Sequence, residues 1–322
     1  MSASYLGNQA FHTWVGGYTN RAIYFPGTAV NGICEAQGYV FRTTGTCSTT
    51  ANTNQRRQLI LQNPTEGQFY GNLFTREDAG TQNYHGLLLS IQRRAASGAN
   101  IGANYTWSHC IGIDPTANNT GRGGPGYVDP NNRNFDRGNC NAVDRRQIFN
   151  VTSVLPSPQF ERPMLRRLAS GWQLANIFRA STGDFLTLVT GLDRSLTGQS
   201  GASGTPPSGQ RPNQILGDPY GDRNSINNYL NPNAFAQPAL GTIGNMRPFN
   251  IEGPGKWQLD MALSRVFQVR ESNKLEFRAE AFNVTNSFIR GDPNTNFNSN
   301  TFGQITMSGN ARIMQFALKY AF

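Results

Sequence analysis

The amino-acid sequence predicts an all-β fold: an antiparallel transmembrane β-barrel segment of about eight strands, with short periplasmic turns and long extracellular loops. Three observations support this prediction. Apolar and polar residues alternate with a period of two, short and long connections alternate along the chain, and the alternation continues up to Phe322. The low charged fraction of 15% fits such a protein, and no stretch approaches the roughly 18–20 uninterrupted apolar residues of a transmembrane helix.

The alternation is clearest in a hairpin formed by residues 83–95 and 99–112, because a short Ala-Ser-Gly-Ala link joins the two segments at 96–99. Towards the C-terminus, residues 274–287 and 310–322 alternate in the same way. The remaining strands are less regular. In chain order, we expect strands at 1–7, 83–95, 99–112, 145–157, 169–182, 256–268, 274–287 and 310–322.

The connections between these strands differ systematically in length. Those at 96–98, 158–168 and 269–273 are short, whereas those at 8–82, 113–144, 183–255 and 288–309 are long and rich in Asn, Gly, Pro and Thr. A soluble sandwich has no reason to place every long loop at one end, whereas an outer-membrane barrel does. A secreted carbohydrate-binding β-sandwich is therefore the weaker interpretation.

Aromatic residues near the strand ends fit the interfacial girdles of a membrane barrel. Trp107, Trp172, Trp257 and Tyr320 occupy such positions, although ordinary core packing is the alternative explanation. A terminal Phe322 with Tyr320 two residues earlier resembles the C-terminal barrel-assembly signal of bacterial outer-membrane proteins. We therefore expect the barrel-assembly machinery to recognise the last strand.

The chain carries a formal net charge of +9, from 28 basic and 19 acidic residues. Nearly all of the basic residues are arginines, and they are scattered along the chain without a nucleic-acid-binding motif. We expect no nucleic-acid partner. A generally basic surface and the phosphates of outer-membrane lipid or lipopolysaccharide both explain this charge.

The four cysteines, Cys34, Cys47, Cys110 and Cys140, predict disulfides, because no C-x-x-C pair accompanies them. Sequence order suggests the pairs Cys34–Cys47 and Cys110–Cys140. The other two connectivities and four reduced thiols remain alternatives. Such disulfides form in an oxidising compartment, yet the first residues lack the basic and apolar regions of a secretory signal.

The sequence contains no signature of an enzyme, so we expect neither catalysis nor a cofactor. Residues 121–126 are rich in Gly but lack the Lys-Ser/Thr of a P-loop, and 129–136 lacks the Gly and Glu of a calcium loop. His12, His85 and His109 are dispersed, without metal-ligand spacing. We expect no metal site.

Charged residues on the face opposite the apolar one are candidates for the barrel lumen. Asp260, Glu276, Arg278 and Glu280 fall on two neighbouring strands in this way. They would either line a solute path or form a structural ladder of compensating charges, and the ladder is the preferred interpretation.

Several motifs resemble the Oar-like TonB-dependent receptors, in the order in which that family has them. A "GW…SG" element at 171–183 is one of them. The others lie at 4–7, 84–87, 144–150, 211–213, 229–235 and 277–283. The resemblance implies that residues 1–322 are the C-terminal part of a receptor barrel of about 22 strands. Its signal peptide, regulatory-like domain and plug are absent from this sequence.

The resemblance also implies a location in the bacterial outer membrane and a role in substrate binding and uptake. TonB would be contacted only through the missing N-terminal regions. Ligand recognition would fall to the long loops, of which 183–255 is the largest candidate; iron chelates, glycans, peptides and cobalamin-like molecules all remain open. The alternative is a self-closing small barrel with an adhesive or structural role. In the fragment interpretation, the strand at 1–7 is an unpaired edge.

Overall fold

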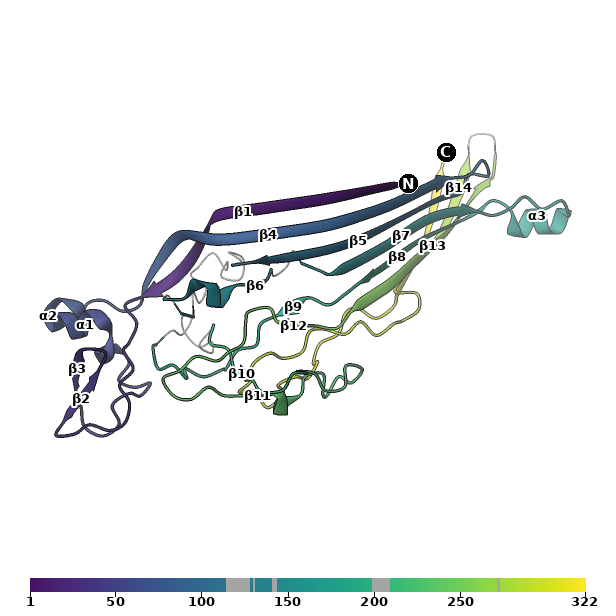
Figure 1. Cartoon of the computed structure of the whole chain (residues 1–322). Coiled ribbons are helices and arrows are strands. Elements are labelled where there is room, and N and C mark those ends of the chain that lie inside the picture. Colours follow the sequence, from purple (N-terminus) through teal and green to yellow (C-terminus); the bar gives the residue numbers. More distant parts are fainter. Residues whose placement is uncertain (114–127, 130, 141–143, 199–208, 271–272) are drawn as a thin grey trace.

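The computed structural model describes the chain except for residues 114–127, 130, 141–143, 199–208 and 271–272. Its dominant feature is one curved antiparallel sheet of eight long strands, which pair in chain order (Figure 1). The two-residue strand β6 (Gly138–Asn139) adds to β5 at the edge of this sheet. The long strands are β1 (Ser2–Thr19), β4 (Leu73–Arg94), β5 (Asn100–Gly112), β7 (Gln147–Pro156), β8 (Trp172–Ser181), β13 (Lys256–Gln268), β14 (Lys274–Phe282) and β15 (Ile313–Ala321).

The sheet is open. Among the described residues, β1 pairs only with β4, and β15 pairs only with β14. The first and last strands are therefore the two edges of the sheet, which agrees with the edge strand expected at 1–7. The eight strands do not close into the small barrel that was the alternative.

The first two long strands extend further than the alternation predicts. β1 continues to Thr19 rather than ending near residue 7, and β4 begins at Leu73 rather than near residue 83. Register shifts interrupt this pair between Ala10 and Thr13 and again before Val15. Each β-bulge reverses which residues face a given side, so the period of two is lost although the pairing continues. The first long connection is therefore 20–72 rather than 8–82.

Two smaller differences concern the ends of strands. β14 stops at Phe282 instead of continuing to 287, because Asn283 adopts a left-handed backbone conformation with φ 50°. The link expected at 158–168 contains the helix α3 (Pro163–Ala169), which begins with a proline at its first turn. Within the described residues, no helix has the length and apolar character needed to cross a membrane.

The pairing register sorts the strand residues onto two faces, because residues directly opposite each other point to the same side. One face, called the apolar face below, is continuous across all eight strands. It includes Tyr5, Leu87, Leu89, Ile101, Tyr105, Trp107, Phe149, Val151, Trp172, Leu174, Phe178, Trp257, Leu259, Leu263, Leu275, Phe277, Phe316, Leu318 and Tyr320. The opposite, polar face includes Ser90, Gln92, Asn104, Thr106, Asn150, Thr152, Arg179, Gln258, Asp260, Ser264, Glu276, Arg278, Glu280, Gln315 and Lys319.

The buried hydrophobic residues lie mainly in the long connections. Residues 20–72 form a lobe at one end of the sheet (Figure 1) around Phe25, Phe41 and a disulfide. This lobe contains β2 (Ile33–Ala36), β3 (Tyr39–Arg42), η1 (Asn54–Arg56), α1 (Gln58–Gln62) and α2 (Pro64–Gly67). We call this end of the sheet the loop end, and the opposite end, where the short connections lie, the turn end.

A second core joins the connections after β8 and β14. Leu188, Leu230, Phe235, Ile251 and Phe302 are buried together there. The short elements of this part of the chain are β9 (Phe185–Leu186), β10 (Asn213–Gln214), η4 (Pro232–Ala234), β11 (Phe235–Ala236) and β12 (Ile251–Glu252), and η3 (Arg133–Asp136) precedes β6. The long connections are thus folded and packed against one another.

Candidate functional site

The four charged residues proposed to face the lumen share the polar face of the sheet. Arg278 lies between two carboxylates on its own strand, 3.0 Å from Glu276 Oε1 and 3.5 Å from Glu280 Oε1. The side-chain amide of Gln315 on β15 donates to Glu280. Each charge in this row therefore has a partner within the chain, which favours a structural ladder over a set of ligand contacts.

Asp260, the fourth of these residues, is largely buried. Its Oδ1 accepts hydrogen bonds from Gln258 Nε2 at 2.6 Å and from the backbone N–H of Asn283 at 2.9 Å. Arg179 on the neighbouring strand β8 lies 3.5 Å from Oδ2. This carboxylate thus ties three segments together, and its main contribution is to hold the turn that follows β14.

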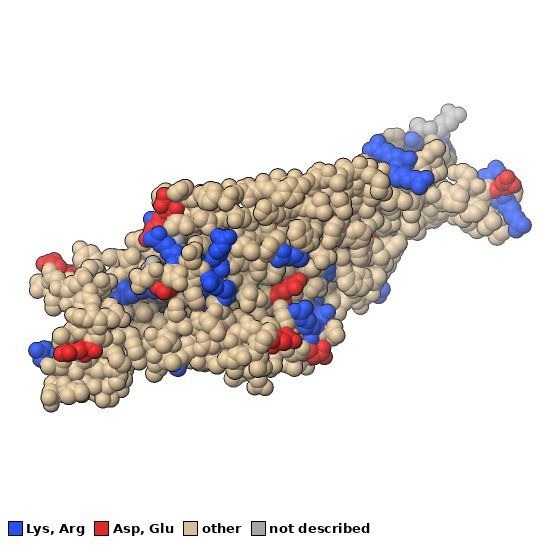
Figure 2. Space-filling model, in the orientation of Figure 1, with Lys and Arg blue, Asp and Glu red and all other residues tan. Residues whose placement is uncertain are grey.

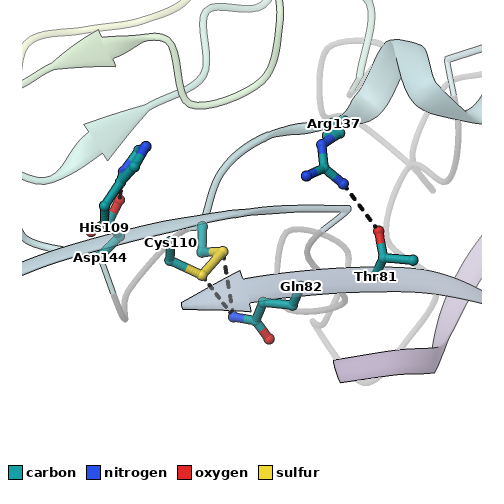
Figure 3. Close-up of a disulfide and its surroundings, with 7 residues drawn as sticks. Thr81, Gln82, His109, Cys110, Arg137 and Asp144 are labelled. Atoms are coloured by element: carbon teal, nitrogen blue, oxygen red, sulfur yellow. Dashed lines mark hydrogen bonds and ion pairs between the residues drawn. A yellow bond between two sulfur atoms is a disulfide. The ribbon is translucent and has the colours of Figure 1, made fainter. Parts of the chain in front are cut away.

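The cysteines form the two disulfides suggested by sequence order, Cys34–Cys47 and Cys110–Cys140. The first lies in the core of the 20–72 lobe. The second joins the loop end of β5 to the segment that contains β6, and Gln82 Nε2 on β4 lies 3.0 and 3.4 Å from its two sulfur atoms (Figure 3). Both bridges therefore restrain long connections.

Polar contacts surround the second disulfide (Figure 3). His109 Nδ1 lies 3.4 Å from the buried carboxylate of Asp144, and Arg137 Nη1 donates to Thr81 Oγ1 at 3.4 Å. Among the described residues, no group of three or more His, Cys, Asp or Glu side chains is placed to hold a metal ion. His109 instead contributes to the packing of the β5–β7 connection.

Buried arginines connect the long loops to one another. Arg56 is fully buried, and its Nη2 donates to the carbonyl oxygens of Thr49 and Leu196, both at 3.0 Å. The neighbouring Arg57 donates to Asn20 O at 3.1 Å. Burial lowers the pKa of both guanidinium groups below the usual arginine value. The first loop is thereby fastened to residues 193–198 of the third.

Arg211, which is also buried, lies in the 211–213 motif and contacts the stretch compared with a calcium loop. Its Nη1 donates to Asp136 Oδ1 at 2.7 Å, and its Nε donates to Met246 O at 2.7 Å. Asp129 Oδ1 accepts from Asn131 N at 2.9 Å, closing a local turn. The acidic residues of 129–136 therefore serve internal structure. The 121–126 stretch lies outside the described residues.

A pocket of about 480 Å³ opens where these loops meet at the loop end of β1. Its walls combine tyrosines, side-chain amides and hydroxyl groups with one arginine and one aspartate. Three long connections contribute to it: 20–72, the described part of 113–146, and 182–255. The lining residues are Tyr18, Thr19, Asn20, Arg21, Ala22, Ile23, Tyr24, Gln37, Tyr39, Gln58, Asp129, Asn131, Ser195, Thr197 and Gly241.

The third long loop, which is the largest candidate region in the sequence, contributes only three of these described lining residues. Most of the pocket comes from 18–58, which has no distinctive motif. Gly241 of the third loop has φ +77° and lies against the ring of Tyr24, where a Cβ atom would clash. A glycine at this position therefore lets the third loop close against the first.

Aromatic residues form a belt near each end of the apolar face. Trp107 and Trp257 lie towards the loop end and are 40% and 47% exposed, and Tyr320, 52% exposed, lies towards the turn end. Such exposure excludes core packing as their role. Trp257 and Phe267 are ten residues apart on β13. That spacing corresponds to about 33 Å along a strand, or about 25 Å across a membrane at a typical barrel tilt.

Figure 2 shows charged side chains at both ends of the upper edge of the molecule, over β1 and β4, and an uncharged stretch between them. Phe322 is 95% exposed next to Tyr320. An exposed apolar face that continues across eight strands is typical of a surface that contacts lipid.

Comparison with known proteins agrees with this geometry. The family model of the outer membrane beta barrel domain matches residues 1–315. No curated protein and no solved structure matches the chain. The apolar face therefore meets the lipid of the bacterial outer membrane, the short turns lie on the periplasmic side and the long loops on the extracellular side. The chain belongs to the family of outer membrane β-barrel domains.

Proposed function

We propose that this chain is the barrel portion of a TonB-dependent receptor, which binds a solute at its extracellular loops and takes part in uptake of that solute. The pocket at the loop end is the main support, because three long connections converge on it. The resemblance of the 171–183 and 211–213 motifs to Oar-like receptors supports the same assignment. Catalysis is not part of the proposal.

The pocket lining favours an uncharged, hydroxylated solute such as a glycan. Tyr18, Tyr24 and Tyr39 offer aromatic rings for the apolar faces of sugar rings, and the amides of Gln37 and Gln58 can both donate to and accept from hydroxyl groups. Among the described residues, the charged members of the lining are Arg21 and Asp129, so this part of the lining carries no net charge. An anionic iron chelate would find less charge complementarity there.

The charged lining residues are engaged with the protein itself. Arg21 Nη1 donates to Val128 O at 2.7 Å. Burial lowers the pKa of this guanidinium to about 10, and Asp129 and Asp136 partly oppose that shift. Arg21 therefore shapes the pocket wall, while the tyrosines and amides supply the contacts to the solute.

Calorimetric titration of the purified chain in detergent with a panel of neutral oligosaccharides and ferric chelates tests the binding step. We expect one class of oligosaccharide to bind. Tyr24→Ala and Gln58→Ala should each weaken that binding roughly tenfold, because each removes a contact worth about 1–1.5 kcal/mol. Tyr70→Ala is the matched control, since Tyr70 is an exposed loop tyrosine outside the pocket.

Uptake of the bound solute by bacteria that produce the protein tests the transport step. A TonB-dependent process requires the proton gradient of the inner membrane, so a protonophore should abolish accumulation without affecting binding. Accumulation that continues after the gradient collapses would contradict the proposal. Adhesion to a surface without binding any soluble compound would instead favour the adhesive alternative.

A further inference from the structure

The turn between β7 and β8 differs from the other described short turns because it contains a helix. α3 projects beyond the sheet at the turn end (Figure 1), and this projection carries both basic and acidic side chains (Figure 2). None of its residues is buried. α3 is therefore a short helix whose residues are all accessible at the turn end of the sheet.

The helix is amphipathic and leaves its apolar residues uncovered. Met164, Leu165 and Leu168 are 74%, 42% and 62% exposed. At about 100° per residue they fall within one arc of roughly 100°, while Arg166 and Arg167 lie outside it. Together with Arg162 just before the helix, these arginines place three positive charges beside an exposed apolar strip, against one negative charge at the exposed Glu161.

The helix is held on the apolar side of the sheet. Trp172 Nε1 donates to Leu168 O at 2.8 Å, and Arg265 donates to Leu168 O at 3.0 Å and to Arg167 O at 2.6 Å. Trp172 and Arg265 are directly opposite each other in the β8–β13 register, on the apolar face. The last carbonyl groups of α3 are thereby fixed to residues that meet lipid.

The level at which the helix is held corresponds to the membrane boundary. The Arg265 guanidinium stacks on Trp172 and Phe267, with its central carbon 5.5 and 4.6 Å from the ring centroids. These aromatic residues belong to the turn-end belt, where amphipathic rings occupy the headgroup region of a barrel. The strip on α3 is therefore continuous with the surface that contacts lipid.

We propose that α3 is an interfacial anchor that binds acidic phospholipids of the periplasmic leaflet. Met164, Leu165 and Leu168 enter the acyl-chain boundary, and Arg162, Arg166 and Arg167 contact the phosphates. Two observations identify this occupant: the strip continues the lipid-facing surface, and its arginines complement an anionic headgroup. Lipid binding by α3 is independent of the solute that the loops bind.

Spin labelling of the full chain in phospholipid nanodiscs tests the position of α3. All four cysteines are in disulfides, so a nitroxide reagent reacts only with an introduced thiol. A label at Leu168→Cys should collide more often with oxygen than with a water-soluble nickel complex. Ser97→Cys, in the turn between β4 and β5, is the matched control and should show the opposite preference.

Lipid selectivity provides a second readout that does not require the label. From nanodiscs containing phosphatidylcholine and phosphatidylglycerol, the unmodified chain should retain phosphatidylglycerol preferentially, and R166Q/R167Q should reduce that enrichment severalfold. The pair R93Q/R94Q, at the neighbouring turn, should change it much less. The proposal would be overturned if the label at residue 168 is exposed to water or is shielded from both quenchers by protein. Equal enrichment of phosphatidylglycerol in the two double variants would also overturn it.

Discussion

Arg211 donates to Asp136 at 2.7 Å across an interface between two extracellular loops, and the two side chains are only 3% and 13% exposed. The guanidinium also lies over the ring of Phe135, 4.8 Å from its centroid. Burial lowers the pKa of Arg211, and the nearby carboxylate of Asp136 opposes the shift. The stability of the loop assembly therefore depends on keeping this buried charge paired.

Asp136→Ala should open the contact between these loops. Removing one partner of a buried ion pair costs about 3–5 kcal/mol, because the other charge remains buried without compensation. Hydrogen exchange at the amides near Met246, whose carbonyl oxygen also accepts from Arg211, measures this loss. Asp218→Ala, at an exposed loop aspartate, is the control and should cost less than about 1 kcal/mol. Equal effects would contradict the proposed role.

Loss of the Cys110–Cys140 disulfide should destabilise the β5–β7 connection. The bridge closes a loop of 30 residues, and chain entropy predicts a cost of about 3–4 kcal/mol for its removal. In C110A/C140A, the backbone pairing of Ile111 with Asn139 should exchange its amide protons faster. C34A/C47A is the internal comparison, because its 13-residue loop predicts about 3 kcal/mol and leaves that pairing unaffected.

Substitutions in the polar row should differ according to burial. Asp260→Ala leaves the backbone N–H of Asn283 without its partner, at a cost of about 1–3 kcal/mol. Arg278→Ala removes contacts of a side chain that is 50% exposed, so the expected cost is below about 1 kcal/mol. Denaturant unfolding in detergent compares the two variants. The reverse order would contradict the structural role assigned to Asp260.

The third loop should lose stability in strongly alkaline solution. Burial raises the pKa of Tyr229 to about 12, above the usual value of about 10, and also raises that of Tyr220. The unfolded state ionises first, so this stability is complete below about pH 10 and is lost as the pH rises through about 12. Ultraviolet titration of tyrosinate and protease resistance of the loop follow the change.

Tyr229→Phe is the control for this pH dependence. The variant lacks the titrating group and loses the hydrogen bond from Tyr229 Oη to Glu252 O at 3.0 Å. It should be less stable than the unmodified protein at neutral pH, yet lose less further stability between about pH 10 and 12. An identical alkaline transition in both proteins would assign the effect to another group.

The strands and the short turns were largely predictable from sequence. Side chains alternate across a strand, so Leu275, Phe277 and Glu276 reveal the two faces without any knowledge of neighbouring strands. The disulfide pairs were also expected, because each closes a local loop. β1 and β4 were underestimated where bulges near Thr13 disrupt the alternation, and α3 was missed because seven residues show too little helical periodicity.

The alternation of apolar and polar residues was enough to predict a membrane β-sheet with one apolar and one polar face, because that pattern is local and repeats every two residues. The way in which the loops pack together depends instead on contacts between residues far apart in the chain. Arg56 meets Leu196 across 140 residues and Arg211 meets Asp136 across 75, and no local pattern predicts such contacts. The pocket and the position of α3 against Arg265 follow from contacts of the same kind, which form only when distant segments pack.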